Sequence, residues 1–405
     1  MPSSPTANDP ARRGTPGEVL RIFLRLGLTC FGGPVAHLGY FRQEFVVRRR
    51  WIDDAAYADL VGLCQFLPGP ASSQVGFALG LGRAGAWGGL AAWAGFTLPS
   101  ALLLVAFAAL ADRLGGPLGL GLLHGLKLVA VAIVAQAVWG MARSLCPDRT
   151  RAAIAAAATL IMLSAPSSAA QIGAILAGGV IGWRFCRPST AAPPPDPTAS
   201  LVSPRIGIAA LAAYGALLLT LPLLTHVLAA PLLALAESCY RAGALVFGGG
   251  HVVLPLLREA FVTPGWIEDG RFLAGYGAAQ AVPGPLFTFA AYLGASVETG
   301  APRLVGATLA LIAIFLPGLL ILLGALPFWH HLRRGAKAQA AMRGINATVV
   351  GLLAAALYDP VWTGTIHTPT DLTLALTGFA LLTAARTPPW IVVALAATAG
   401  LLLSS

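Results

Sequence analysis

Long apolar stretches separated by short polar turns run through almost the whole chain. Before residue 186 they cover 18–41, 58–82, 85–111, 117–142, 151–164 and 168–185. After a polar stretch they cover 206–228, 231–257, 272–297, 303–329, 344–358, 370–385 and 388–404. An apolar stretch of about 17–25 residues is long enough to cross a bilayer as a helix. The pattern predicts an all-α polytopic membrane protein with about 10–13 membrane segments.

Charged residues are scarce. Only 10% of the residues are charged and the mean hydropathy is +0.77, whereas a soluble domain carries roughly 25% charged residues. The formal net charge of +10 lies in short loops, which favours membrane topology over nucleic-acid binding as its cause. The five cysteines lack the spacing of a metal site or a disulfide framework, and no ATP-binding motif is present. We therefore expect no metal, no cofactor and no enzymatic centre.

Polar segments divide the chain into two halves. Residues 1–17 are polar and Pro-rich and lack the apolar core of a signal peptide, so we expect a disordered cytoplasmic tail. A Pro/Ser/Thr-rich linker at 187–205 separates a first domain, 18–186, from a second domain, 206–405. The stretch at 206–228 has no counterpart in the first half, and we expect it to be an extra helix.

One stretch of sequence occurs twice, at 25–70 and at 241–285. The matches at an offset of 216 are Arg25 with Arg241, and Phe31-Gly32-Gly33 with Phe247-Gly248-Gly249. The matches at an offset of 215 are Glu44 with Glu259, Trp51 with Trp266, Gln65 with Gln280, and Pro68-Gly69-Pro70 with Pro283-Gly284-Pro285. So many matches in the same order indicate an internal duplication.

Two observations indicate that the repeats face opposite sides of the membrane. Seven predicted segments separate the two copies, and an odd number of crossings inverts the second one. The turn at 42–50 is basic, whereas its counterpart at 258–271 is not, and the later loop at 330–343 is more basic than its counterpart at 111–127. By the positive-inside rule, these opposite biases predict an inverted-topology repeat.

The first apolar stretch, 18–41, does not fit a simple crossing. It carries Arg21 and Arg25, and basic residues flank both of its ends, which places both ends in the cytoplasm. A segment that dips into the membrane at Phe-Gly-Gly and returns would reconcile these charges. The Pro-Gly-Pro segments are also expected to be broken or re-entrant, because this sequence interrupts a helix at membrane depth.

Broken segments at matching places in two inverted halves are typical of transport sites. Glycines let backbone N–H groups converge, and a helix that starts at the break directs its positive dipole end there, which suits an anion. The alternative is that these Gly and Pro residues only permit tight packing and kinks. The expected substrate-binding residues are Arg25, Phe31, Gly32, Gly33, Pro34, Gln65, Pro68, Gly69, Pro70, Arg241, Phe247, Gly248, Gly249, Gly250, His251, Gln280, Pro283, Gly284 and Pro285.

Arg25 and Arg241 are the strongest single candidates, because an intramembrane charge costs at least ~2.5–3.5 kcal/mol and usually faces a cavity. Arginine suits an oxyanion, since its planar fork of donors keeps its charge. A snorkelling side chain or an ion pair with a duplicated glutamate is the alternative. The candidates for proton coupling, ion pairing or a polar lining are Glu44, Glu259, His37, Lys127 and Asn346.

The repeated motifs resemble the chromate ion transporter (CHR) family in its long-chain, two-domain form. FGGP followed by a basic turn and QFLPGP, then FGGGHVVLPLL followed by QAVPGPLF, stand where that family has its own motifs. The resemblance covers nearly the whole chain. It implies a multi-pass protein of the bacterial inner membrane that exports chromate from the cytoplasm and confers chromate resistance.

Chromate itself does not follow from the residues. The donor set suits any tetrahedral dianion, so sulfate is an alternative substrate and import is an alternative direction. Export of an uncompensated dianion would gain ~4.6 kcal/mol at 100 mV, with proton exchange as a second energy source. The expected partners are chromate or sulfate and the lipid bilayer. Nucleic acid is not expected, and a homodimer is left open.

Overall fold

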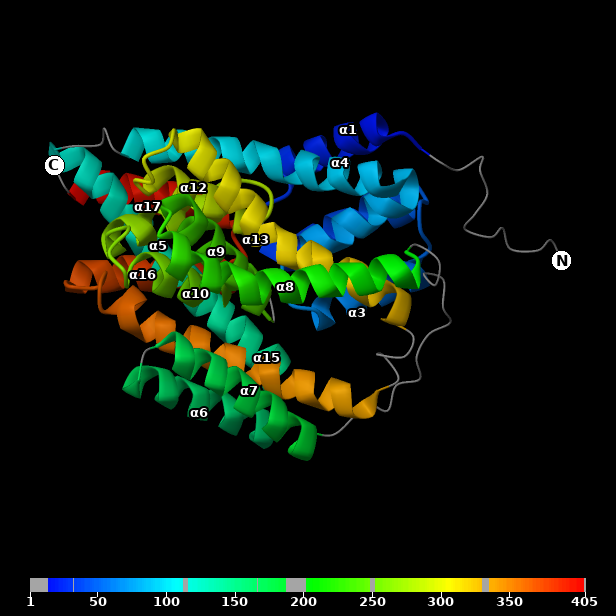
Figure 1. Ribbon diagram of the computed structural model, residues 1–405. Helices are drawn as coiled ribbons and strands as arrows, with labels where there is room; N and C mark the ends of the chain where they lie inside the picture. The colour runs from blue at the N-terminus through cyan, green and yellow to red at the C-terminus, as the bar shows by residue number, and fades with distance from the viewer. Residues whose placement is uncertain are drawn as a thin grey trace.

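The computed structural model describes residues 14–31, 33–111, 116–165, 167–186, 202–247, 252–329 and 335–403. Within these residues the chain forms helices joined by turns, and no strand is found (Figure 1). The predicted all-α fold is therefore confirmed. The predicted N-terminal tail and the predicted linker lie mostly outside the described residues.

The first half begins with helices too short to cross a membrane and continues with longer ones. In chain order they are α1 (Pro16–Thr29), α2 (Gly33–Phe41), the π-helical η2 (Arg42–Arg48), α3 (Asp54–Phe66), α4 (Ala71–Ala111), α5 (Gly116–Leu145), α6 (Arg149–Ser164) and α7 (Ser168–Phe185).

The second half repeats this order after one additional helix, α8 (Pro204–Leu228). The following elements are α9 (Pro231–Leu245), α10 (Val253–Phe261), α11 (Asp269–Ala281), η4 (Leu286–Thr288), α12 (Phe289–Ser296), α13 (Arg303–Ala325), η5 (Leu326–Phe328), α15 (Ala336–Ala356), η6 (Leu357–Trp362), α16 (Pro369–Thr383) and α17 (Pro389–Leu403).

Polar side chains cap the starts of many of these helices. A side-chain oxygen accepts a hydrogen bond from the first-turn backbone at Thr15, Asp53, Asp148, Ser167, Ser203 and Thr368. Such caps satisfy backbone N–H groups that the helix itself leaves without partners. They explain why the helices begin where the sequence turns from polar to apolar.

Five of the described helices are long and apolar enough to cross a membrane. They span Ala71–Ala111, Gly119–Leu145, Pro204–Leu228, Arg303–Phe328 and Ala336–Trp362. Leucines stay exposed along their outer faces, among them Leu102 on α4 and Leu219 on α8, as contact with lipid requires.

The α1–α2 segment is a hairpin that enters and leaves at the same end of the molecule. The Gly14 N–H donates to the Arg83 carbonyl oxygen at 3.1 Å. The Arg83 guanidinium pairs with Glu18 at 3.2 Å and lies 5.1 Å from the centre of the Trp51 ring. The chain has thus returned to its starting end twice, once through each break of the first repeat. The predicted re-entrant dip at Phe-Gly-Gly is confirmed.

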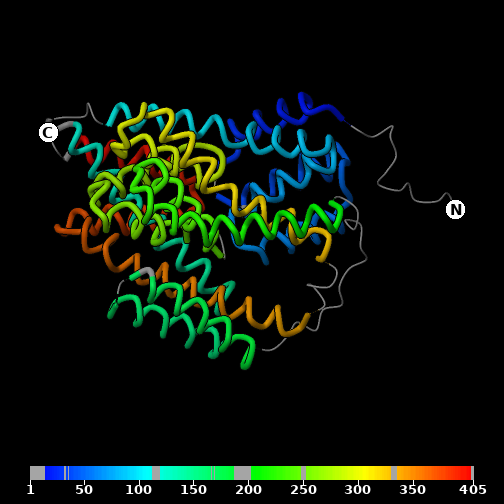
Figure 2. Tube along the Cα trace, viewed as in Figure 1, coloured from blue at the N-terminus to red at the C-terminus, as the bar shows by residue number. Residues whose placement is uncertain are grey.

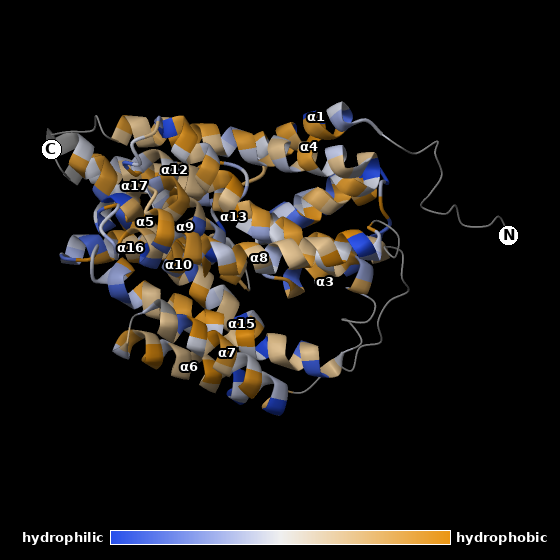
Figure 3. Ribbon diagram, in the orientation of Figure 1, coloured by the Kyte–Doolittle hydropathy of each residue, from blue (hydrophilic) through white to orange (hydrophobic). Residues whose placement is uncertain are grey.

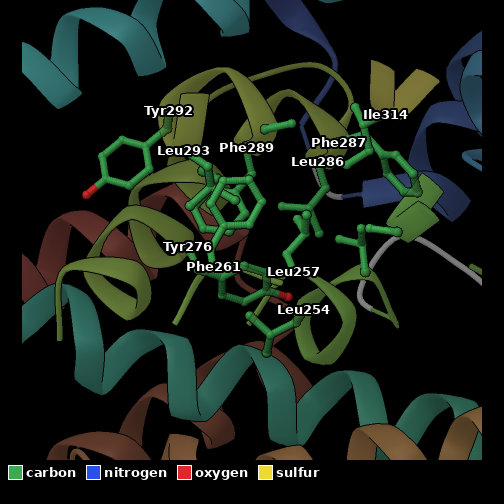
Figure 4. Packing of buried hydrophobic residues seen from close by; sticks show 14 of the residues in the cluster. Leu254, Leu257, Phe261, Tyr276, Leu286, Phe287, Phe289, Tyr292, Leu293 and Ile314 are labelled. Atoms are coloured by element: carbon green, nitrogen blue, oxygen red, sulfur yellow. The ribbon is translucent and has the colours of Figure 1, made fainter. Parts of the chain in front are cut away.

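The second repeat folds in the same way. Phe272 on α11 packs against Phe289 on α12 with ring centroids 5.2 Å apart. The Tyr292 hydroxyl donates to the Arg271 carbonyl oxygen at 3.0 Å, so α11 and α12 run antiparallel on either side of the second Pro-Gly-Pro. Figure 4 shows the core of this repeat, in which apolar side chains of α10, α11, α12 and α13 pack together.

A tight helical hairpin follows each Pro-Gly-Pro. α4 is kinked at Ala84 and Gly85, where Gly85 has a φ of 65°, and its two arms fold against each other. A Cβ atom on Gly80 would collide with the Gly88 carbonyl oxygen. The α12–α13 hairpin repeats this contact, because a Cβ atom on Gly294 would collide with the Gly306 carbonyl oxygen. Small residues are what allow such close approach of membrane helices.

The two halves are inverted and intertwined. The long arm of α4 and its counterpart α13 run in opposite directions (Figures 1 and 2), which confirms the predicted inverted repeat. The last two helices of each half pack against the other half, α16 and α17 on α5, and α6 and α7 on α15. Close glycine contacts mark both interfaces, at Gly125 against Ala396 and at Gly344 against Gly178.

The end of the molecule where α1, α8 and α15 begin carries hydrophilic patches (Figure 3). The cations of this end include Arg42, Arg48, Arg49, Arg50, Arg83, Arg205 and Lys337. Arg42 donates to Asp54 at 2.7 Å, and this hydrogen bond holds the pKa of the Asp54 carboxyl below its usual range. We call this the basic end.

Candidate functional site

The four breaks of the chain meet in the middle of the molecule. The Gly69 N–H of the first Pro-Gly-Pro donates to the Val246 carbonyl oxygen, 2.7 Å away, next to the second Phe-Gly-Gly. The Gly284 N–H of the second Pro-Gly-Pro donates to the Cys30 carbonyl oxygen, 2.9 Å away, next to the first Phe-Gly-Gly. Each bond is the repeat equivalent of the other, so the two inverted repeats are joined reciprocally through their breaks.

Only glycine fits the middle position of each Pro-Gly-Pro. Gly69 has a φ of 116° and Gly284 a φ of 94°, a region that side chains other than glycine rarely adopt. Space is short as well. A Cβ atom on Gly69 would lie 2.9 Å from the Cα of Gly318 on α13, and one on Gly284 would lie 2.9 Å from the Ser100 hydroxyl oxygen on α4. Each Pro-Gly-Pro therefore rests on the long helix of the opposite half.

Gln74 fastens the first Pro-Gly-Pro to that opposite helix. Its side chain is fully buried, and its Nε2 donates to the Pro68 carbonyl oxygen at 2.9 Å and to the Gly318 carbonyl oxygen at 2.8 Å. The corresponding position of the second repeat is Phe289, which cannot make these bonds. Sequence reasoning missed Gln74, although a glutamine four residues after Pro70, at the start of a largely apolar helix, was a usable signal.

Helices begin at the breaks, as the sequence predicts. α2 starts at Gly33, which has a φ of 77°, and α4 starts directly after Pro70. In the second repeat, η4 and α12 follow Pro285. N-termini placed in this way offer unpaired N–H groups and a positive dipole end to an anion. The candidates Gly32, Gly248, Gly249, Gly250 and His251 lie outside the described residues.

Arg25 lies on the exposed face of α1. Arg21, one turn earlier, is exposed on the same face, together with Leu24 and Leu28. Among the described residues, neither arginine has a carboxylate within ion-pair distance. Two cations without counter-charges thus stand on the helix that leads to the first Phe-Gly-Gly.

Arg241 has a different environment. Its Nε lies 2.8 Å from Glu237 Oε1, one turn earlier on α9, and the two side chains are 34% and 12% exposed. It also lines a small cavity with Glu259, to which α1 contributes no residue. The two duplicated arginines therefore do not share this cavity. Sequence reasoning missed Glu237, although an acid four residues before an arginine on a helix is a recognised pairing signal.

The duplicated glutamates have partners other than the duplicated arginines. Glu44 pairs with Arg48 at 3.2 Å and with Arg49 at 2.5 Å. Glu259 accepts a hydrogen bond from the Thr263 hydroxyl at 3.2 Å. The alternative of an Arg25–Glu44 ion pair is therefore not what the structure shows.

The remaining candidates are spread around the breaks. His37 is buried, with Nδ1 3.4 Å from the Ser72 hydroxyl oxygen. Gln65 is exposed, whereas Gln280 Nε2 is buried and has no hydrogen-bond partner in the described part of the chain. Lys127 lies next to Gly270, where α11 begins. Asn346 Oδ1 on α15 is likewise buried without a partner among the described residues.

The aromatic and proline residues of the motifs contribute packing. The Phe31 ring lies 6.0 Å from that of Trp390 on α17, and Phe247 lines an apolar groove of about 440 Å³ between α7, α8, α9 and α15. Pro34 lies in the first turn of α2. No group of three or more His, Cys, Asp or Glu side chains within the described ranges could hold a metal ion.

Comparison with known proteins identifies relatives across both halves. The family model described as "Chromate transporter" matches residues 17–183 and 233–401, so α8 lies outside both matched segments. The chain is 30% identical to a chromate transport protein of Pseudomonas aeruginosa, over 84% of this chain and 80% of that protein. It is 28% identical to a chromate transport protein of Cupriavidus metallidurans, over 90% of this chain and 87% of that protein.

An uncharacterized transporter of Methanocaldococcus jannaschii is 24% identical over 84% of this chain and 82% of that protein. No solved structure matches significantly. The match to this family agrees with the structure, which has two repeats, broken helices that meet at the centre and long apolar helices. The chain belongs to the chromate transporter family.

Proposed function

We propose that this chain exports chromate from the cytoplasm across the bacterial inner membrane and thereby confers chromate resistance. The reciprocal hydrogen bonds that join Gly69 to Val246 and Gly284 to Cys30 carry the proposal. They bring breaks from both inverted repeats to one place, where helix starts can bind an anion. Relatives named chromate transport proteins support chromate as the anion.

Arg25 and Arg21 are the proposed first contacts of the anion. Both are exposed on α1, and neither is neutralised by a carboxylate of the described residues. Arg25 lies five residues before Cys30, which corresponds to ~7.5 Å along a helix. A dianion that enters along this face would pass from Arg21 to Arg25 and then to the helix starts at the breaks.

The basic end is the proposed cytoplasmic end. Positively charged loops remain on the cytoplasmic side of membrane proteins, and the cations of this end flank α1, α8 and α15. This orientation places the N-terminus in the cytoplasm. It also opens the hairpins of the first repeat toward the cytoplasm and those of the second repeat toward the other side.

The membrane potential alone can drive export. Moving one charge across 100 mV is worth about 2.3 kcal/mol, so a dianion that leaves a negative interior gains ~4.6 kcal/mol. At ~1.4 kcal/mol per tenfold, this corresponds to roughly a 2000-fold gradient. Uptake of the same dianion would need several co-transported cations.

Sulfate is the second candidate substrate, because it has the charge and tetrahedral shape of chromate. Chromate accumulation in cells with and without the gene, with sulfate as competitor, tests both candidates. Export predicts lower chromate content in cells that carry the gene. Higher content would indicate an importer, and a loss of the difference in excess sulfate would indicate a shared site.

A further inference from the structure

An apolar groove of about 440 Å³ lies between the two halves of the molecule. One wall belongs to α7 of the first half, and the others belong to α9, Phe247 and α15 of the second half, with Tyr214 contributed by α8. Its volume falls in the range of ligand pockets, about 300–1,000 Å³. Among the described residues, no charged side chain lines the groove, so it suits an apolar ligand.

The α7 wall of the groove is an exposed apolar stripe. Leu176, Val180 and Trp183 follow one another at a spacing of three or four residues and therefore share one face of the helix. They line the groove and are 66%, 62% and 50% exposed. A lipid tail beside a convex face, such as that of Leu219 on α8, is touched from one side only. In the groove, α7, α9 and α15 would hold it from three sides.

Cations stand at one end of the groove. Lys337, Ala341 and Ile345 lie along one face of α15 because they are four residues apart, and the last two line the groove. The Lys337 Nζ lies 5.9 Å from the centre of the Trp183 ring, and the neighbouring Arg184 is exposed. In the part of the chain that the structure describes, neither cation has a carboxylate within ion-pair distance.

An apolar groove that ends at cations is complementary to an anionic phospholipid. Tryptophan is enriched at the level of lipid head groups, so Trp183 marks the end of the groove at the bilayer surface. This is the basic end, the proposed cytoplasmic end, and the cytoplasmic leaflet carries anionic lipids. A second copy of the chain packed into the groove would account for its apolar lining, but not for the cations at its end.

The groove also reaches the second break. Leu245 and Phe247 line it, and the carbonyl oxygen of Val246 between them accepts the hydrogen bond from Gly69 at 2.7 Å. An acyl chain in the groove would therefore contact the residues on both sides of this junction. It would also fill the space between α7 of the first half and α9 of the second, and so support the contact of the two halves.

We propose that this groove binds one anionic phospholipid, with the phosphate at Lys337 and Arg184 and one acyl chain along α7. The bound lipid stabilises the folded chain by joining its two halves beside the second break. This binding goes beyond the proposed export of chromate and does not require it.

Native mass spectrometry of the detergent-solubilised full chain measures the binding without chromate. We expect the wild type to bind one phosphatidylglycerol at least about fivefold more tightly than phosphatidylcholine, the gain expected from one cation near an anionic head group. The double variant Lys337→Gln/Arg184→Gln should lose this preference. Arg50→Gln, at another exposed cation of the basic end, should keep it. Equal affinity of the wild type for both lipids, or an unchanged preference in the double variant, would overturn the proposal.

Ala341→Phe tests the place of the acyl chain, because its ring fills the groove and leaves both cations in place. We expect phosphatidylglycerol to bind at least about tenfold more weakly, since burial of several CH₂ groups is lost. The lipid should raise the unfolding temperature of the wild type but not of this variant. Ala157→Phe, on an exposed face of α6, is the matched control and should behave as the wild type.

Glycerol phosphate, which has the charged group without acyl chains, keeps the proposal testable if Ala341→Phe does not fold. It should not displace phosphatidylglycerol from the wild type at equal concentration, and displacement would contradict a site built around the groove. A dimer that binds no lipid and dissociates in Ala341→Phe would assign the groove to a second copy and likewise overturn the proposal. A chain that binds the lipid but transports no chromate would refute the proposed function alone.

Discussion

The Gly69 N–H donates to the Val246 carbonyl oxygen at 2.7 Å and so ties a Pro-Gly-Pro of one repeat to the Phe-Gly-Gly of the other. Its repeat equivalent, from Gly284 to Cys30, measures 2.9 Å. Backbone groups at membrane depth need partners, because no bulk water is available there. The two repeats supply these partners to each other, so any rocking of one repeat must move or break both bonds.

Gly69→Ala and Gly284→Ala should each impair folding and transport. Both positions have positive φ and lack space for a Cβ atom, and backbone strain of this kind costs about 1–3 kcal/mol. We expect a lower unfolding temperature in detergent and an about tenfold lower chromate flux at equal protein level. Gly39→Ala on α2 is the matched control, since its Cβ would meet no atom within 4 Å. An unchanged flux in both variants would contradict the role of the breaks.

Gln74→Leu should loosen the first Pro-Gly-Pro. The substitution removes two buried hydrogen bonds and leaves the Pro68 and Gly318 carbonyl oxygens without them, at a cost of about 1–3 kcal/mol. We expect the loss in thermal unfolding measurements, together with reduced flux. Gln43→Leu, at an exposed glutamine, should have neither effect. If Gln74→Leu is as stable as the wild type, the two hydrogen bonds of Gln74 are not needed to hold the first Pro-Gly-Pro.

Arg25→Gln should reduce transport more than it reduces stability. Arg25 is exposed and has no carboxylate partner in the described structure, so little packing depends on its charge. Removing one positive charge from the path of a dianion should lower the ratio of the maximal transport rate to KM for chromate at least about tenfold. A tenfold loss corresponds to ~1.4 kcal/mol. Arg205→Gln, at the exposed start of α8, is the control. Equal kinetics of Arg25→Gln and wild type would remove Arg25 from the path.

Gly125→Ala should destabilise the contact between α5 and α17. A Cβ atom there would collide with the Ala396 backbone, and overpacking typically costs about 1–3 kcal/mol. Gly140→Ala, on the same helix, meets no atom within 4 Å and should be neutral or slightly stabilising, since alanine favours helices by up to ~1 kcal/mol. Thermal unfolding of both variants measures the difference. Equal unfolding temperatures would argue against the intertwined halves.

The sequence predicted the inverted repeat and the re-entrant first hairpin, because matched motifs and loop charges survive in a linear pattern. It did not predict which half each Pro-Gly-Pro contacts, because the contact of Gly69 with Gly318 depends on the helices' arrangement in space. The two arginines looked equivalent by alignment, yet Glu237 neutralises only Arg241. The position one turn before the duplicated arginine is Arg21 in the first repeat and Glu237 in the second. This single difference gives Arg25 and Arg241 different environments, although both arginines are retained.

Chromate uptake into inside-out membrane vesicles tests the central claim most directly. With the vesicle interior made positive, we predict that wild-type vesicles accumulate chromate and that Gly69→Ala and Gly284→Ala vesicles accumulate about tenfold less at equal protein level. Wild-type vesicles that accumulate no more chromate than vesicles without the protein, or variants that match the wild type, would contradict a chromate exporter built around the joined breaks.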